Sequence, residues 1–275
     1  MGCYPLFACQ DWSKLAEDLD QLGNAQLENA QLGSAQLGSE LVSLSIVTDP
    51  FGEYDPAYLE RCFPDLVVAF KEHFVTDLSR PRDSFVPVNH RRNTRRAQAE
   101  MEIEKCANPA EFLDDWTKLY ATLVARHGIT GILTFSRESF ARQLQVPGIV
   151  AFRAVRDGET LGMLLWYEQG NRAYYHLGAY SSAGYDLRAS FALFSYSMEY
   201  FAEHGIKWLS LGAGAGSDPE AKSGLTRFKE GWATETRKVY FCGRIFDPAK
   251  YQEIVSARHV APTKYFPAYR AGEFA

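Results

Sequence analysis

Residues 174–194 read YYHLGAYSSAGYDLRASFALF, and this stretch decides the fold. An extended segment comes first, small polar residues then interrupt it, and a long apolar segment follows. The pattern predicts a strand over 172–180, a serine-rich turn and a helix that ends at Gly205. The residues on either side must therefore supply strands that pair with 172–180 and helices that cover it.

The neighbouring segments complete a mixed pattern. In chain order they predict a strand over 101–108, helices over 109–128 and 136–145, strands over 148–157, 159–169 and 172–180, a helix over 184–205, a strand over 207–212, a helix over 223–232 and a strand over 237–246. Turn signals such as Asp157-Gly158 join the three consecutive strands. This order is α+β, with a mixed central sheet flanked by helices. It lacks the regular alternation of a doubly wound nucleotide-binding fold.

The succession of elements resembles the fold of the GNAT acyltransferases, and within that superfamily it resembles the FemAB-like branch of peptidyl and aminoacyl transferases. The resemblance is carried by HRRNTRRA (90–97), by residues 174–194 and by GLTRFKEGWATETR (224–237). It covers residues 99–246 well and residues 4–88 loosely. It implies an N-acyltransferase that moves an acyl or aminoacyl group to an amine of a peptide, an amino acid or a small metabolite. The alternative is a non-catalytic GNAT-like module that binds a peptide or an acyl carrier.

The resemblance also implies a domain organisation. Residues 1–88 are expected to form a degenerate GNAT-like unit, residues 89–246 the catalytic GNAT-like domain, and residues 247–275 an extended C-terminal arm. Within the first unit, residues 24–38 repeat a pentapeptide, NAQLE NAQLG SAQLG, whose leucines do not follow a helical stripe. We expect a mobile insertion over 23–40, followed by a strand over 41–47 and a helix over 56–74.

The composition excludes several classes of protein. The net charge of −5 gives no general attraction to nucleic acid or to an anionic membrane, so a polyanion would need a local basic patch. The five scattered cysteines include no CxxC pair, which leaves free thiols in a reducing compartment and no expected metal site. The sequence shows neither a signal peptide nor 18 consecutive apolar residues. We therefore expect a cytoplasmic protein.

In the resembled fold the strand at 172–180 parts from the strand at 207–212, and the donor lies in the gap with its phosphates at the next helix. The residues expected to bind the donor here are Ser181, Ser182, Gly184, Tyr185 and Arg188. Ordinary GNAT donors are held by a loop of the pattern Q/R-x-x-G-x-G/A, whereas this chain has AYSSAGYDLR with one glycine. Acyl-coenzyme A, an acyl carrier protein and aminoacyl-tRNA all remain possible donors.

Transfer to an amine requires a group that takes a proton and a group that protonates the leaving atom. Strand alternation places Tyr174, His176, Gly178 and Tyr180 on one face. His176 is the candidate base because its ordinary pKa lies nearest neutrality, although a hydrogen-bonded structural histidine is the simpler alternative. Tyr180 and Tyr240 are the candidate acids, with ordinary packing as the alternative for both.

Two further segments hold cations that could contact an anionic substrate. Arg92 and Arg96 belong to a run of four arginines on the expected helix near residue 90, and a tRNA donor would be met there. Arg227 and Lys229 follow the glycine run 212–216. That run matches neither the dinucleotide fingerprint nor the phosphate-binding P-loop, so we expect a hinge beside the transfer site. A solvated charged surface is the alternative for all four residues.

Overall fold

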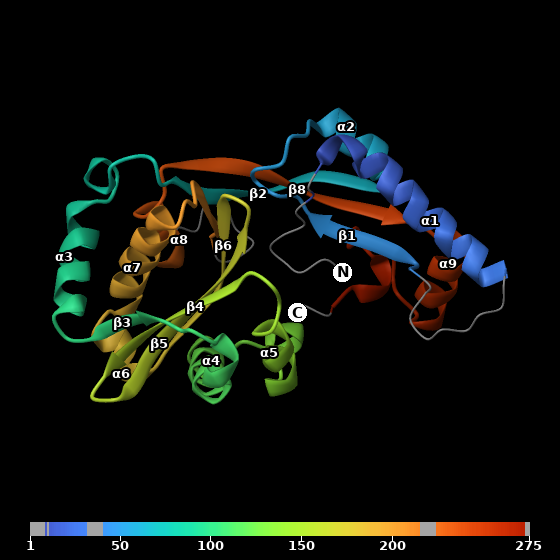
Figure 1. Cartoon of the computed structure of the whole chain (residues 1–275). Helices are drawn as coiled ribbons and strands as arrows, with labels where there is room; N and C mark the ends of the chain where they lie inside the picture. The colour runs from blue at the N-terminus through green and yellow to red at the C-terminus, as the bar shows by residue number, and fades with distance from the viewer. Residues whose placement is uncertain (1–8, 10, 32–40, 215–223, 273–275) are drawn as a thin grey trace. The chain divides into compact units, whose positions relative to one another are not determined.

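The strands follow one order from edge to edge. The computed structural model describes residue 9 and residues 11–31, 41–214 and 224–272 (Figure 1). The described strands lie in the order β1-β8-β2-β7-β6-β5-β4-β3. Their bounds are β1 Ser43–Val47, β2 Leu66–Asp77, β3 Glu102–Lys105, β4 Ile149–Arg156, β5 Glu159–Gln169, β6 Arg172–Tyr180, β7 Trp208–Gly212 and β8 Glu235–Ile245. β6 and β7 are parallel, whereas β3, β4, β5 and β6 are antiparallel to their neighbours in turn, which confirms the mixed sheet.

The chain divides into two compact units, and the division differs from the expected one. The first unit contains residues 1–72 and 238–273, and the second contains residues 73–237. The compact units divide at residue 72, within β2, whereas the sequence predicted a boundary after residue 88. The expected boundary after residue 246 is wrong because β8 enters the first unit, where Ile245 pairs with Ser43 of β1. The first unit is therefore formed by two segments that lie far apart in the sequence.

The sheet of the second unit carries helices on both faces (Figure 1). The helices are α3 (Val88–Gln98) and α7 (Ala189–Glu203) on one face, and α4 (Leu113–His127) and α5 (Arg137–Gln143) on the other. Trp166 and Phe194 lie in the core beneath α7. Trp116 and Phe140 lie in the core beneath α4 and α5. A buried core on each face gives the second unit the three-layer organisation that the sequence predicted.

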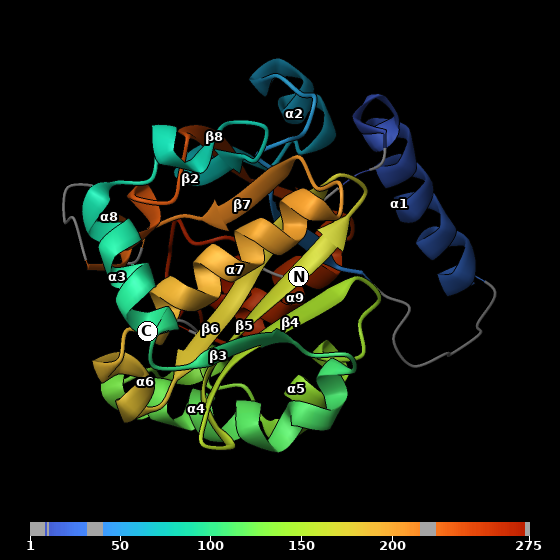
Figure 2. The same cartoon turned by 60° about the vertical axis from the view of Figure 1, so that its left-hand side comes forward.

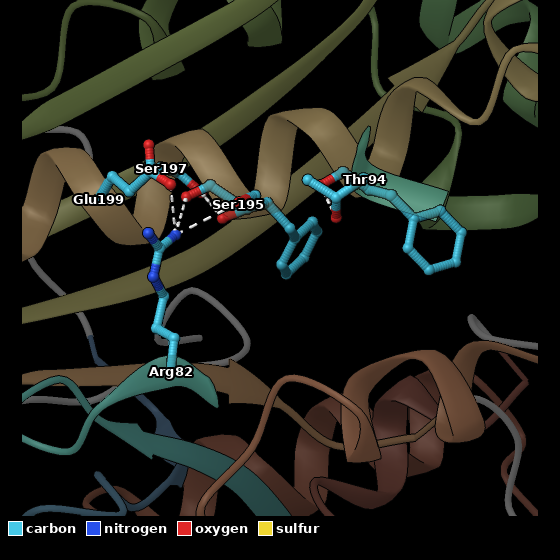
Figure 3. A network of polar contacts seen from close by, with 7 residues as sticks. Arg82, Thr94, Ser195, Ser197 and Glu199 are labelled. Atoms are coloured by element: carbon cyan, nitrogen blue, oxygen red, sulfur yellow. Dashed lines mark hydrogen bonds and ion pairs between the residues drawn. The ribbon is translucent and has the colours of Figure 1, made fainter. Parts of the chain in front are cut away.

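Polar contacts fasten α7 to earlier parts of the same unit (Figure 3). Arg82, in the 3-10 helix η2 (Arg82–Ser84), forms an ion pair with Glu199 at 2.5 Å between Nη1 and Oε1. The same nitrogen donates to the carbonyl oxygen of Ser195 at 3.3 Å. Thr94 of α3 donates its hydroxyl to the carbonyl oxygen of Phe191 at 3.4 Å. Both charged side chains of the ion pair are about 40% exposed, so the pair contributes about 1 kcal/mol at most. The aromatic core therefore holds α7 more than these contacts do.

The helix expected over 184–205 is divided. α6 (Ser182–Asp186) ends first, and α7 begins only at Ala189. Arg188 lies between them with a φ of 60°, in the left-handed region that interrupts a right-handed helix. The expected single continuous helix was therefore wrong: two helices, α6 and α7, take its place.

The first unit shows two further differences from the sequence predictions. α1 (Leu15–Gln31) continues into the pentapeptide repeat, so the insertion expected from residue 23 is helical as far as Gln31. The repeat is rich in alanine, glutamine and leucine, all of which favour helices whatever their leucine spacing. Residues 32–40 lie outside the described part of the chain. The helix expected over 56–74 is also wrong, because α2 (Pro56–Cys62) is short and β2 follows it.

The residues after β8 are not one extended arm. Pro248–Ala257 form α9, capped by the carboxylate of Asp247, which accepts from the amide of Lys250. The chain then returns to the sheet, where the ring of Phe266 fills the space beside Gly243. Ala268 begins the 3-10 helix η5 (Ala268–Arg270), and its amide donates to the hydroxyl of Tyr251 at 2.7 Å. The segment is thus a folded part of the first unit, because its prolines stand at a helix start and between helices.

Candidate functional site

β6 and β7 part from each other at the centre of the second unit. Their parallel pairing covers only Arg172 with Trp208, Ala173 with Leu209 and Tyr174 with Ser210. β6 then continues to Tyr180, while β7 ends at Gly212, and the two strands diverge (Figure 2). Among the described residues, the later half of β6 has a ladder partner in β5 and none in β7. This is the divergence that the resemblance to the GNAT fold implied.

A β-bulge at His176 changes which side chains share a face. Leu165 of β5 pairs with Leu177, and Trp166 pairs with Tyr175, so His176 is the extra residue on β6. Before the bulge, Tyr175 faces the core beneath α7. After it, Leu177 faces the core beneath α4. The expectation that His176 and Tyr180 lie on one face is therefore wrong, because Tyr180 packs on the α7 side and His176 lies on the side of α5.

The imidazole of His176 is held between two side chains. Its Nε2 lies 2.8 Å from Oε1 of Gln143, the last residue of α5. The ring of Tyr167 on β5 lies 5.1 Å from the imidazole, measured between ring centroids. Burial lowers the pKa of His176 from 6.5 to about 4, because removal from water disfavours the charged ring. The side chain is therefore neutral at pH 7, with one ring nitrogen that has a free lone pair, and it is a weaker base than an exposed histidine.

Two phenols converge on the other face of β6. Gly178 lies between them, and a Cβ at that position would stand 2.4 Å from the hydroxyl oxygen of Tyr175 and 3.1 Å from that of Tyr180. Burial raises the pKa of both phenols, so both remain protonated at neutral pH. Glycine at this position therefore leaves room for two neutral hydroxyl donors beside the later half of β6.

Lys229 lies deeper than the sequence predicted. It belongs to α8 (Gly224–Glu230), and only 6% of the residue is exposed. Its Nζ donates to the carbonyl oxygen of Ala213 at 2.7 Å, just beyond β7. The same atom lies 5.5 Å from the centroid of the Tyr175 ring. The alternative of a solvated charged surface is therefore wrong for Lys229, whereas Arg227 on the same helix is exposed.

The residues expected to bind a donor gather at α6, where most of them also stabilise the fold. Ser181 is the N-cap of α6, and its hydroxyl accepts from the amide of Gly184 at 3.0 Å. A Cβ at Gly184 would stand 2.0 Å from the carbonyl oxygen of Leu161, so glycine is needed there for helix packing. The ring of Tyr185 packs against Tyr180 and lies 4.2 Å beneath the guanidinium carbon of Arg126. Ser182 is the first residue of α6, and Arg188 follows its end.

The basic segment near residue 90 separates into a buried side and an exposed side. His90 is buried, and its Nε2 lies 3.1 Å from the carbonyl oxygen of Phe228 in α8. Arg92 and Arg96 are exposed on α3, as is Arg95. No ion pair with any described residue is found for these three side chains. The two sequence stretches around residues 90 and 228 thus meet in space, with the arginines left facing solvent.

Tyr240 lies in a different unit from the other two candidate acid–base residues. It is part of the first unit, whereas His176 and Tyr180 are part of the second. Its ring packs 6.2 Å from that of Tyr54, measured between centroids, and its amide donates to the hydroxyl of Thr48. These contacts give Tyr240 a structural role in the core of the first unit.

The sequence did not single out Gln143 or Tyr175. Gln143 lies at the end of a short helix that nothing in its pattern ties to β6, and Tyr175 was expected on the face opposite Tyr180. Only strand pairing reveals the bulge that brings Tyr175 to the side of Tyr180.

The described residues contain no group of three or more potential metal ligands. None of the described helices is long and apolar enough to cross a bilayer.

Known proteins share this architecture. FemX matches with a TM-score of 0.63 and 17% identity, over 89% of this chain and 80% of FemX. The C-terminal domain (DUF2156) of a protein from Agrobacterium fabrum, assigned as a lysylphosphatidylglycerol synthetase, has a TM-score of 0.55 and 16% identity, over 85% of this chain and 75% of that domain. The L-PGS structure from Bacillus licheniformis has a TM-score of 0.51 and 17% identity, over 79% of this chain and 73% of its own. No curated protein matches the sequence.

These structures are too distant in sequence to show more than a common fold. A family model shows the family to which the chain belongs. The model of the acetyltransferase (GNAT) domain matches residues 88–230, which begin at α3 and end with α8. The matched segment contains the diverging strands, the bulge at His176 and the two phenols of β6. The chain therefore belongs to the GNAT family and is an acyltransferase.

Proposed function

We propose that the protein transfers an aminoacyl or acyl group from an activated carrier to an amine at the divergence of β6 and β7. The observation that carries this proposal is the bulge, which puts a neutral imidazole on the α5 side of β6 and a protonated phenol on the α7 side. A base and an acid on opposite faces of one strand suit a reaction in which two substrates approach from opposite faces of the sheet.

The proposed reaction is a direct transfer. The amine nitrogen attacks the acyl carbonyl carbon, and a C–N bond forms while the C–O or C–S bond to the carrier breaks. His176 takes the proton that the amine releases and passes it to solvent. Tyr180 donates its proton to the leaving oxygen or sulfur and recovers one from solvent. Burial keeps the phenol of Tyr180 protonated at neutral pH, so the proton is present when the leaving atom departs.

Aminoacyl-tRNA is the donor that the described residues support best. Gly184, the one glycine of the turn after β6, is needed for the packing of α6 against Leu161, which leaves the turn without a second glycine for a phosphate. The exposed arginines of α3 offer an RNA backbone a cluster of positive charge in a chain of net charge −5. One protein of similar fold is the C-terminal domain of a lysylphosphatidylglycerol synthetase, whose name denotes an aminoacylated lipid. Acyl-coenzyme A and acyl carrier protein are the alternative donors, and the cytoplasm is the proposed location.

The proposal is tested by transfer assays with the purified protein. Mixed aminoacyl-tRNA, acetyl-coenzyme A and fatty-acyl-coenzyme A are each offered with a panel of amines, and products are detected by mass spectrometry. His176→Ala is expected to lower turnover about 100-fold and to change donor binding less than about twofold. His127→Ala, which removes an exposed histidine of α4, serves as the matched control. Turnover by His176→Ala at the wild-type rate would remove the imidazole from the reaction, and binding without turnover in the wild type would favour the non-catalytic module.

A further inference from the structure

We propose that Gln143 is a positioning residue that fixes His176 in one tautomer, with the proton on Nε2 and the lone pair on Nδ1. The catalytic meaning of this inference rests on the proposed function, whereas the tautomer itself is a property of the folded protein. Gln143 lies 33 residues before His176 in the chain, and α5 brings the two together on the face of β6 opposite Tyr180.

A chain of two hydrogen bonds carries the inference. Nε2 of Gln143 donates to the hydroxyl oxygen of Ser139 at 3.1 Å, one helical turn earlier in α5. That bond directs the amide oxygen of Gln143 toward His176, whose Nε2 lies 2.8 Å away. An amide oxygen can only accept a hydrogen bond, so Nε2 of the imidazole must carry the proton. Nδ1 is then the nitrogen that can accept one.

The hydrogen bond to Gln143 is the main influence on the tautomer of His176, given the other groups around the ring. Tyr167 of β5 is the titratable group that faces the ring. On α4, Tyr120 donates its hydroxyl to the carbonyl oxygen of Leu133, and on α5, Arg142 is exposed. Burial is the single cause of the lowered pKa of His176, with no contribution from a charged neighbour. The neutral amide of Gln143 therefore orients the ring without stabilising its charged form.

The residue type at position 143 matters for the same reason. A carboxylate there would orient the ring equally well, but it would also stabilise the imidazolium and raise the pKa of His176. An apolar side chain would leave Nε2 without an acceptor. Glutamine is the choice that fixes the tautomer and keeps the imidazole neutral over a wide range of pH.

Nuclear magnetic resonance tests the tautomer without any assay of activity. Two-bond proton–nitrogen correlations distinguish the two neutral tautomers, and the spectrum of His176→Asn identifies the His176 signals among the six histidines of the chain. The wild type is expected to show the Nε2–H form alone at pH 7. Gln143→Leu is expected to show a mixture, and Gln145→Leu, which changes an exposed glutamine of the same segment, is expected to match the wild type. An Nδ1–H tautomer in the wild type, or an unchanged tautomer in Gln143→Leu, overturns the inference.

The pH dependence of transfer tests the catalytic meaning. Gln143→Leu is expected to lower kcat about tenfold at every pH, with KM within about twofold, because the wrong tautomer is populated. Gln143→Glu is expected to keep the tautomer and to move the acid limb of the profile upward by about one to three pH units. A profile in Gln143→Glu that coincides with the wild type overturns the positioning role. Absence of transfer by the wild type contradicts the proposed function instead, and the tautomer measurement still decides the inference.

Discussion

At the scale of single residues, His176 shows how burial sets a proton equilibrium. The pKa falls from 6.5 to about 4 because the folded chain removes the ring from water. As the pH falls below 6.5, the unfolded chain takes up the proton before the folded chain does, so folding stability decreases until the pH is below about 4. Above pH 6.5 both states are neutral, and this contribution to stability is fully present.

This argument predicts that the acid sensitivity of the fold depends on His176. His176→Gln is expected to lose less stability than the wild type between pH 7 and pH 4.5, because it has no proton to take up at this position. Urea unfolding at the two pH values measures the difference. His90 is also buried with a lowered pKa and stays present in both proteins, which cancels its contribution. Equal losses in the two proteins would show that the burial of His176 does not affect stability.

Lys229 shows a second effect of burial on a single side chain. The sequence predicted that Lys229 and Arg227 contact an anionic substrate, and in helix α8 Lys229 is buried whereas Arg227 is exposed. Nζ of Lys229 is satisfied by the carbonyl oxygen of Ala213, while its charge lies over the ring of Tyr175. Burial thus places the ammonium of Lys229 beside the aromatic ring of Tyr175 and not in solvent.

At the scale of elements, the packing of α6 on β5 depends on one missing side chain. Gly184→Ala is expected to lower the free energy of unfolding by about 2–4 kcal/mol, because the added methyl group meets backbone that cannot move aside. The methyl carbon would stand 2.0 Å from the carbonyl oxygen of Leu161. Denaturant unfolding measures the change.

The matched control is Gly224→Ala at the start of α8. Nothing lies within 4 Å of the added methyl group there, so the stability is expected to change by less than about 1 kcal/mol. A loss at Gly184 no larger than that at Gly224 would contradict the close packing of α6 against β5.

At the scale of the whole molecule, the distribution of charge separates the possible donors. Arg92, Arg95 and Arg96 give α3 an exposed positive surface, although the net charge of the chain is −5. If the donor is aminoacyl-tRNA, replacement of all three by alanine is expected to reduce the slope of log K against log salt by about 2 to 3, since each phosphate contact releases counterions.

Fluorescence titrations of tRNA at several salt concentrations measure this slope. Arg142→Ala, which removes an exposed arginine of α5, controls for the general loss of positive charge. A salt slope that the triple substitution leaves unchanged would exclude α3 as the RNA-binding surface and would favour acyl-coenzyme A or an acyl carrier protein as the donor.

Local patterns predicted much of the second unit. Ser136 and Gly128 mark helix ends by side-chain capping and by a positive φ, which act within a few residues. The strand boundaries of the β4–β5–β6 meander are similarly signalled by turns. The helix expected over 56–74 was wrong because its apolar residues also suit a strand, and only pairing decides between the two.

The sequence by itself determined the α+β class and the order of the elements around residues 174–194, because alternation, caps and turns are local properties. His176 and Tyr180 stay predictions as site residues. Tertiary structure alone decided the bulge at His176, the separation of His176 from Tyr180 onto opposite faces, and the contact with Gln143. It also decided the burial of Lys229 and the return of the C-terminal residues to the first unit. These features depend on strand register and on contacts between distant segments, which no local pattern specifies.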